Sequence, residues 1–210
     1  MSSFPNTPVA TSKTAALSRI LDSVPKGYVF WMAGQIPKEK MERLARKFHE
    51  RYGIGCSPAQ RITRKQQGQA NALLVLYCPP DCTSVEWLLL ATQGNGMQSE
   101  TLRRIDEKPR LVWLGYELLR YATRQKTSWT WRRTKAEMAE WYALLESQLK
   151  PNQMFKVEYT LVRIAYQPGF HGVREQSFAL CQFAQAHGYR GEIPHLFYLE
   201  KVSHGERILL

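Results

Sequence analysis

The sequence predicts an α/β (α+β) protein in which helices flank a mixed β-sheet. Short apolar or alternating runs bounded by Gly, Pro or Asn predict strands, and apolar residues at helical spacing predict amphipathic helices between them. No Gly/Ser/Pro-rich linker interrupts this succession. We therefore expect one continuous domain over residues 13–210, with its core at 27–150 and an extension at 151–210, after a mobile N-terminus at 1–12.

The first half of the chain reads as alternating helices and strands. We expect helices at 13–24, 37–52 and 99–105, a turn at 25–27, and strands at 28–32, 72–77 and 85–92. A further, basic helix is predicted from Ser57 to about Gly68, because Ser57 is a suitable N-cap, Pro58 suits the first helical turn and glycine suits the end.

The second half predicts a β-hairpin followed by helices and strands. Residues 111–123 fit helical spacing as well as strand alternation, but a polar loop joins them to the aromatic run at 129–133, and this favours a hairpin. A helix follows at 135–149. The extension at 151–210 is expected to be a strand–helix–strand unit with elements at 157–165, 173–187 and 195–202.

The net charge of +11 is concentrated in two windows. Residues 37–68 hold nine Lys/Arg against three acids, and residues 101–135 hold ten against three. Such windows point to a polyanionic partner, with nucleic acid first and an acidic membrane surface or acidic protein second.

Other classes of protein are excluded by absent patterns. No apolar run approaches the roughly 18 residues of a spanning helix, so no membrane insertion is expected. The N-terminus lacks a signal-peptide core. The cysteines, Cys56, Cys78, Cys82 and Cys181, lack zinc-site spacing, and we expect reduced thiols in a cytoplasmic protein without a metal centre.

The basic helix is the first candidate site. Arg61 and Lys65 share a helical face and Arg64 lies beside Arg61, so the three cations are placed to grip a phosphate. The backbone N–H groups at the start of this helix would assist them. The alternative is an ordinary solvated basic helix.

The aromatic hairpin strand is the second candidate. Trp129 and Trp131 would project to one face beside Arg132 and Arg133, which suits base stacking combined with backbone contacts. We favour the alternative, in which both tryptophans belong to the core.

The loop that precedes residue 173 is the third candidate. Gly169 and Gly172 would allow backbone amides to face outward, His171 titrates near neutral pH and Arg174 begins a helix, which together suit an anion or nucleotide. The alternative is a turn whose glycines only permit positive φ.

Nuclease chemistry would also need an acid to hold a metal or move a proton. Glu86, Glu100 and Glu117 are the acids nearest the basic segments and are therefore the candidate catalytic residues. For Glu117, which has apolar neighbours, a structural ion pair with Arg120 or Arg132 is favoured.

Two resemblances extend this interpretation. Residues 53–76, GIGCSPAQRITRKQQGQANALLVL, resemble the phosphate-binding segment of ParB/sulfiredoxin-fold proteins, although Arg61-x-x-Arg64-Lys65 stands in place of a compact Gly-x-Arg-Arg. The wider pattern over residues 27–133 resembles plasmid fertility-inhibition proteins of the Osa and FiwA type. The segments that carry it are GYVFWMAGQIP, KFHERYGIG, WLLLATQG and SWTWR.

The resemblance implies a ParB/sulfiredoxin-like domain that blocks conjugative DNA export through a type IV secretion system. Proteins of the Osa type are associated with ATPase and DNase activity, which implies Mg²⁺ and ATP as cofactors, but no catalytic residue of the family can be placed on this chain. Our first hypothesis is therefore a DNA- or nucleotide-binding inhibitor of plasmid transfer with or without nuclease activity. The alternatives are a non-enzymatic DNA-binding accessory protein and a protein that docks on an acidic partner such as a secretion coupling ATPase.

Overall fold

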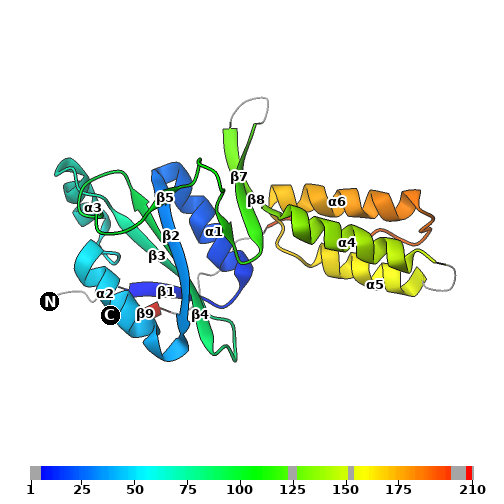
Figure 1. The fold of residues 1–210 in the computed structure, drawn as a ribbon, viewed down its shortest axis with the longest axis horizontal. Coiled ribbons are helices and arrows are strands. Elements are labelled where there is room, and N and C mark those ends of the chain that lie inside the picture. The colour runs from blue at the N-terminus through cyan, green and yellow to red at the C-terminus, as the bar shows by residue number, and fades with distance from the viewer. Residues whose placement is uncertain (1–5, 123–126, 151–153, 200–206, 210) are drawn as a thin grey trace. The chain divides into compact units, whose positions relative to one another are not determined.

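The computed structural model describes residues 6–122, 127–150, 154–199 and 207–209 (Figure 1). Within these residues the protein is a mixed α+β structure, as predicted. The chain forms two compact units, which are Met1–Pro109 together with Val202–Leu210, and Arg110–Lys201. The boundary that we expected at residue 151 is not where the contacts divide the chain. The N-terminal prediction concerns residues 1–12, of which 1–5 lie outside the described part and Asn6–Ala10 form a strand.

The first unit is built on a mixed sheet with the strand order β5–β2–β4–β3–β1–β9. β1 and β3 are parallel, whereas every other neighbouring pair is antiparallel. The strands are β1 (Asn6–Ala10), β2 (Tyr28–Pro37), β3 (Ala72–Tyr77), β4 (Ser84–Thr92), β5 (Arg103–Arg104) and β9 (Arg207–Leu209).

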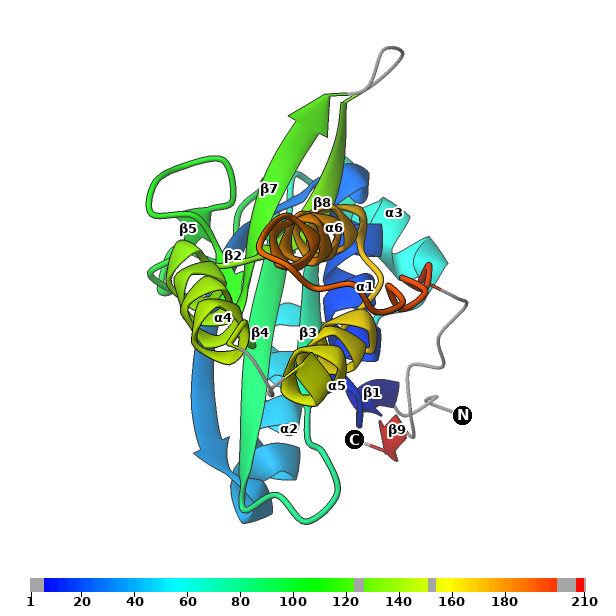
Figure 2. The ribbon, with the colours of Figure 1, turned by 90° about the vertical axis from the view of Figure 1, so that its right-hand side faces the viewer.

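Helices cover both faces of this sheet. They are α1 (Lys13–Ser23), α2 (Met41–Tyr52) and α3 (Pro58–Gln66), with single 3₁₀ turns at η1 (Val24–Lys26) and η2 (Lys38–Lys40). Figures 1 and 2 show α1 and α2 on opposite faces of the sheet. The central strands are therefore enclosed from both sides, which explains why their sequences are continuously apolar.

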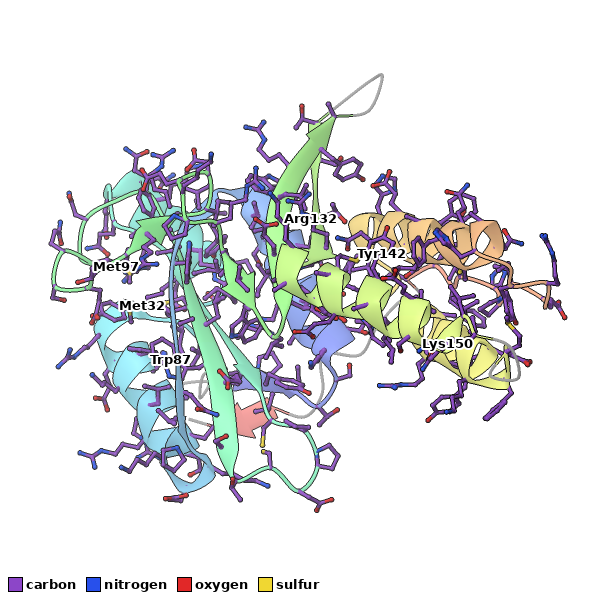
Figure 3. The ribbon with its side chains drawn as sticks, turned by 45° about the vertical axis from the view of Figure 1, so that its right-hand side comes forward. Met32, Trp87, Met97, Arg132, Tyr142 and Lys150 are labelled. Atoms are coloured by element: carbon purple, nitrogen blue, oxygen red, sulfur yellow. The ribbon has the colours of Figure 1, made fainter. Side chains whose placement is uncertain are left out.

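The central strand β3 shows how the core is shared between the two faces. Leu74 and Leu76 belong to the cluster under α2, which includes Ala45, Phe48 and Tyr52 of that helix and to which Met32, Trp87 and Met97 contribute (Figure 3). Leu73 and Val75, which alternate with them, are also buried. Residues 72 to 76 of the strand are thus buried on both faces of the sheet.

Two predictions in the first unit need correction. The segment 99–105 is not a helix, because Arg103 and Arg104 pair with Trp31 and Phe30 to form the edge strand β5. In addition, the strand predicted at 28–32 is longer than expected, because β2 continues through Gly34 to Pro37. A Cβ at this glycine would lie 2.7 Å from Cζ2 of Trp87, so the missing side chain makes room for the indole on the neighbouring strand.

The second unit combines a three-stranded antiparallel sheet with three helices. The predicted hairpin is confirmed, and its strands pair from Tyr116–Arg133 to Ala122–Thr127. The elements are β6 (Val112–Trp113), β7 (Tyr116–Ala122), β8 (Thr127–Arg133), α4 (Lys135–Gln148), α5 (Met154–Ala165) and α6 (His171–Ala186). None of the helices in the described ranges is long and apolar enough to cross a membrane.

In the predicted strand–helix–strand extension the two strands are wrong, whereas the helix predicted at 173–187 is confirmed as α6. Residues 157–165 belong to α5, and 195–199 have no regular structure, while 200–202 lie outside the described residues. Val157, Leu161 and Ile164 are buried at helical spacing in a cluster with α4 and α6. Exposed apolar residues on the opposite side of the helix, such as Tyr159, gave the sequence its apparent strand alternation.

Candidate phosphate-binding site

A pocket of about 470 Å³ opens in the first unit between the side of α3 and the ends of three strands. The start of β2, the end of β4 and Asn71, which directly precedes β3, meet at this pocket. Tyr28 of β2 pairs with Thr92 of β4. Thr92 in turn exchanges hydrogen bonds with Asn71. The lining residues are Lys26, Gly27, Tyr28, Val29, Arg61, Ile62, Lys65, Asn71, Thr92 and Gln93. The antiparallel pairing brings these segments together although they are far apart in the sequence.

Three cations line this pocket, which we call the cationic pocket. Lys26 comes from the turn before β2, while Arg61 and Lys65 come from one face of α3. None of the lining residues, all of which the structure describes, is acidic. The Arg61 guanidinium is part-buried; its Nη2 donates a long bond of 3.5 Å to the carbonyl of Ile54. The pocket therefore has the charge and the donors that a phosphate group requires.

A buried amide oxygen adds a second kind of group. Asn71 is 8% exposed, and its Nδ2 donates to the carbonyl of Arg61 at 3.0 Å. Its Oδ1 is buried without a hydrogen-bond partner among the described residues, and so is Nε of Arg61. Because the Asn71 oxygen lacks a hydrogen-bond donor and lies in a pocket lined by cations, the pocket suits a ligand that carries an N–H or O–H donor as well as a negative charge.

Two of the features of α3 that we expected to bind phosphate, the backbone amides at its start and Arg64, form hydrogen bonds within the chain instead. At the start of the helix, the N–H of Ser57 bonds Oε1 of Gln60 at 2.8 Å and the N–H of Gln60 bonds Oγ of Ser57 at 3.3 Å, so this capping box occupies amides that were expected to bind phosphate. Arg64 does not line the pocket, and its Nη2 donates to the carbonyl of Ala70 at 2.9 Å. Only Arg61 and Lys65 of the three predicted cations line the pocket.

A second basic surface follows α2. A hollow of about 590 Å³ is lined by Ile36, Lys40, Arg43, Leu44, Arg46, Lys47, Glu50 and Arg51. Lys40, Arg43, Lys47 and Arg51 are exposed and follow one another at intervals of three or four residues, which places them in a row along one side of α2. We call this row the α2 basic row. It presents several cations against a single lining acid, Glu50.

The candidate acids lie apart from the cationic pocket. Glu86 stands opposite Gln35 and Tyr77 in the sheet, and burial raises its pKa. Glu100 accepts a hydrogen bond from the hydroxyl of Tyr52. The structure brings neither of them to the pocket lining.

Glu117 forms a structural ion pair, as favoured. Its carboxylate bonds Nη2 of Arg132 at 2.8 Å and Nη1 of Arg110 at 3.2 Å. Burial would raise the pKa of Glu117, but the hydrogen bonds and charges of Arg132 and Arg110 outweigh burial and hold this pKa below its ordinary value. Arg132 therefore has an acidic partner within its own sheet (Figure 3).

Two of the predicted nucleic-acid contacts on β8 are in the interior. Trp131 and Arg133 are fully buried, while Trp129 is half-buried with the Arg120 guanidinium 5.6 Å from its ring centroid. Arg133 donates from Nε to Gln167 at 2.7 Å, from Nη2 to Ser177 at 2.9 Å and from Nη1 to the carbonyl of residue 173 at 3.1 Å. Burial lowers the pKa of Arg133. In the described structure neither residue is accessible to a nucleic acid.

His171 does not lie in a loop as predicted but, like Arg174, in the first turn of α6, where both contact residues of their own unit. The His171 ring stacks on Tyr121 at a centroid distance of 4.6 Å, and its Nε2 lies 3.1 Å from Glu175. Arg174 donates from Nε to the carbonyl of Leu196 at 3.3 Å, and its guanidinium lies 3.5 Å from the ring centroid of Tyr198. The structure places these two residues near one another but gives each a partner.

The described residues do not provide a site suited to Mg²⁺. No three His, Cys, Asp or Glu side chains within the described ranges are grouped so that they could hold a metal ion. Mg²⁺ with ATP usually requires at least one protein carboxylate, and the cationic pocket lacks one. We therefore derive no step through a metal or ATP.

Comparison with known proteins adds no relative: no family model matches the chain, and neither a curated protein nor a solved structure shows significant similarity to it.

Of the residues that line the cationic pocket, Arg61 and Lys65 were predicted from the sequence, whereas Lys26, Asn71 and Thr92 were not. The sequence pattern that could have identified Lys26 is the turn at 25–27, because it places a cation directly before the strand β2. Its position beside α3 depends on the pairing of β2 with β4, which the sequence does not display.

Proposed function

We propose that this chain binds DNA or a nucleotide through the cationic pocket, and that this binding underlies inhibition of conjugative plasmid transfer. The observation that carries the binding proposal is the set of three cations, Lys26, Arg61 and Lys65, around a hollow without an acid, beside the orphaned Oδ1 of Asn71. A phosphate satisfies the cations, and a sugar hydroxyl or base amino group satisfies the amide oxygen. The role in plasmid transfer rests on the resemblance to fertility-inhibition proteins.

The α2 basic row favours a polymer over a single nucleotide. Three of its exposed cations, Arg43, Lys47 and Arg51, span about 12 Å along α2, given a rise of about 1.5 Å per residue, and Lys40 directly precedes the helix. This is enough to follow more than one phosphate of a DNA strand. The row and the cationic pocket belong to the same unit. Both surfaces therefore support DNA as the ligand.

Binding is better supported than hydrolysis. The pocket lining offers cations and amides but no carboxylate that could activate water. The candidate acids Glu86 and Glu100 belong to other parts of the first unit, and Glu117 is held by two arginines of the second. We therefore put DNA binding first and treat DNase or ATPase activity as a consequence of the resemblance that needs its own test.

The test is fluorescence anisotropy with labelled single- and double-stranded DNA over a series of salt concentrations. We expect the wild-type chain to bind at low salt, and the Arg61→Ala/Lys65→Ala variant to bind at least about tenfold more weakly, with a salt dependence reduced by about 2 in log–log slope. Lys150→Ala/Arg190→Ala, which removes two exposed cations of the second unit, is the matched control and should bind as the wild type does.

Two results would contradict the proposal. Absence of DNA and nucleotide binding at low salt would remove it and favour docking on an acidic protein partner. Equal binding by the wild type and the Arg61→Ala/Lys65→Ala variant would show that the cationic pocket is not the site. The role in plasmid transfer is tested separately by conjugation frequency in cells that express each variant, and any DNase activity is tested by incubation with Mg²⁺ and each of the Glu86, Glu100 and Glu117 variants.

A further inference from the structure

The outer face of α5 carries a continuous row of large apolar side chains. Phe155 is 67% exposed, Tyr159 65%, Val162 36% and Tyr166 77%. Tyr166 directly follows α5 and continues its hydrogen-bond pattern, since its N–H donates to the carbonyl of Val162 at 3.1 Å. Isolated surface aromatics are common, but a row of this kind marks an interaction surface. We call these four residues the α5 seam.

The α5 seam is separate from the buried side of the same helix. Val157, Leu161 and Ile164 pack in the cluster shared with α4 and α6, and Figure 2 shows the three helices nearly end-on with α5 at one corner of the triangle. The residues of the seam therefore lie outside the buried cluster of their own helices. At its far end, the Tyr166 ring lies 6.0 Å from that of Phe197, which is itself half exposed and extends the apolar surface.

The spacing of the seam is that of a coiled coil. Its residues follow at intervals of 4, 3 and 4, from 155 to 159, 162 and 166. This is the alternation of d and a positions in a heptad, with Phe155 and Val162 at d and Tyr159 and Tyr166 at a. Such a face is completed by another helix with the same period.

The charges beside the seam identify that helix. In this heptad register Glu158 occupies position g and Arg163 occupies position e, on opposite flanks of the seam. In a parallel pair of coiled helices, a g residue meets the e residue five positions further along the partner, so Glu158 of each chain would meet Arg163 of the other. An antiparallel pair would instead place Glu158 against Glu158 and Arg163 against Arg163.

We propose that the α5 seam is a self-association surface, through which two copies of this chain pair with their α5 helices parallel. The aromatic residues at a and d would be buried between the copies, and two Glu158–Arg163 pairs would flank them. In the single chain Arg163 is exposed, with its guanidinium 5.6 Å from the Trp141 ring centroid and 5.8 Å from that of Tyr159. The inference does not depend on DNA binding.

The experiment is sedimentation velocity on the full chain from about 1 to 500 µM, a range that covers weak dimers. The wild type is expected to shift from monomer toward dimer as its concentration rises. Tyr159→Glu should be monomeric throughout, because it puts a charge at the centre of the seam. Each of Glu158→Arg and Arg163→Glu should weaken dimerisation by about tenfold, since two attractive contacts become repulsive.

Charge restoration makes the test specific. An equimolar mixture of Glu158→Arg and Arg163→Glu chains pairs opposite charges at both contacts, and the Glu158→Arg/Arg163→Glu double variant does so within one chain, so both should dimerise as the wild type does. Glu146→Arg, an equal charge change at an exposed site of α4, should have no effect. Circular dichroism melting curves confirm that each variant is folded.

Three outcomes would overturn the proposal. A wild-type chain that stays monomeric at every concentration would assign the seam to a different protein. Dimers that Tyr159→Glu leaves intact would place the interface elsewhere. Dimers that Tyr159→Glu abolishes but the single charge variants leave unchanged would mean that the helices do not pair in parallel.

Discussion

Arg61 and Arg133 both come from the basic windows of the sequence, yet their surroundings are opposite. Arg133 is fully buried and makes three hydrogen bonds of 2.7 to 3.1 Å with acceptors of its own unit. Arg61 is part-buried, makes one long bond of 3.5 Å and lines a hollow. The acceptors that the chain supplies, and not the charge itself, decide whether an arginine holds the fold together or remains available to a ligand.

The strongest test of this contrast is Arg133→Ala. We expect it to lower the free energy of unfolding of the second unit by about 4 kcal/mol, because it removes a fully buried, packed side chain and takes away the donor of the buried Ser177 hydroxyl oxygen. Thermal or urea unfolding measures the change. Arg132→Ala, whose side chain is 30% exposed, should cost under about 1 kcal/mol. Similar losses in the two variants would refute the structural role assigned to Arg133.

A finer test compares two arginines of the same helix. Arg61→Ala should weaken binding of DNA or nucleotide about tenfold with little change in stability, because its contact within the chain is a long one. Arg64→Ala should do the reverse, with a loss of about 1 to 2 kcal/mol, because the carbonyl of Ala70 loses its donor. Anisotropy titrations and urea unfolding of both variants measure the two effects. A larger loss of binding in Arg64→Ala would mean that the ligand is held by Arg64 and not by Arg61.

The smallest expected effect concerns pH. The pKa of Glu117 is lower in the folded chain than in the unfolded chain, so the stabilisation from its ion pairs is fully present above the unfolded pKa and is lost as pH falls through the folded pKa. We expect the stability difference between wild type and Glu117→Gln to be under about 1 kcal/mol near pH 7 and to shrink toward zero as pH falls below the ordinary glutamate pKa of about 4.3. Urea unfolding at several pH values measures it, and a difference that grows at acid pH would contradict the assignment.

Local signals in the sequence were sufficient for much of the fold. Ser57 and Pro58 identified the start of α3, and the continuous apolar run at 72–77 identified a strand enclosed from both sides. The extension failed for a physical reason. α5 is apolar on two opposite faces, one in its core and one at the α5 seam, and this pattern imitates the alternation of a strand.

The candidate site was only half predictable. Arg61 and Lys65 share a helical face, which spacing alone reveals. Lys26 and Asn71 join them through the pairing of β2, β4 and β3, which is a long-range property of the sheet. The burial of Arg133 was equally hidden, because its acceptors lie on a loop and a helix more than thirty residues further along the chain.

The pairing of β9 with β1 has a consequence for biosynthesis. Arg207–Leu209 line up against Asn6–Pro8 at the edge of the first sheet, although the whole of the second unit is encoded between β5 and β9. During translation, the first unit therefore leaves the ribosome with β1 as an open edge, and that edge is closed only after residues 110–201 have been made. A nascent chain that stalls within the second unit would expose this edge to other chains, so premature termination is expected to yield aggregation instead of a shorter folded protein.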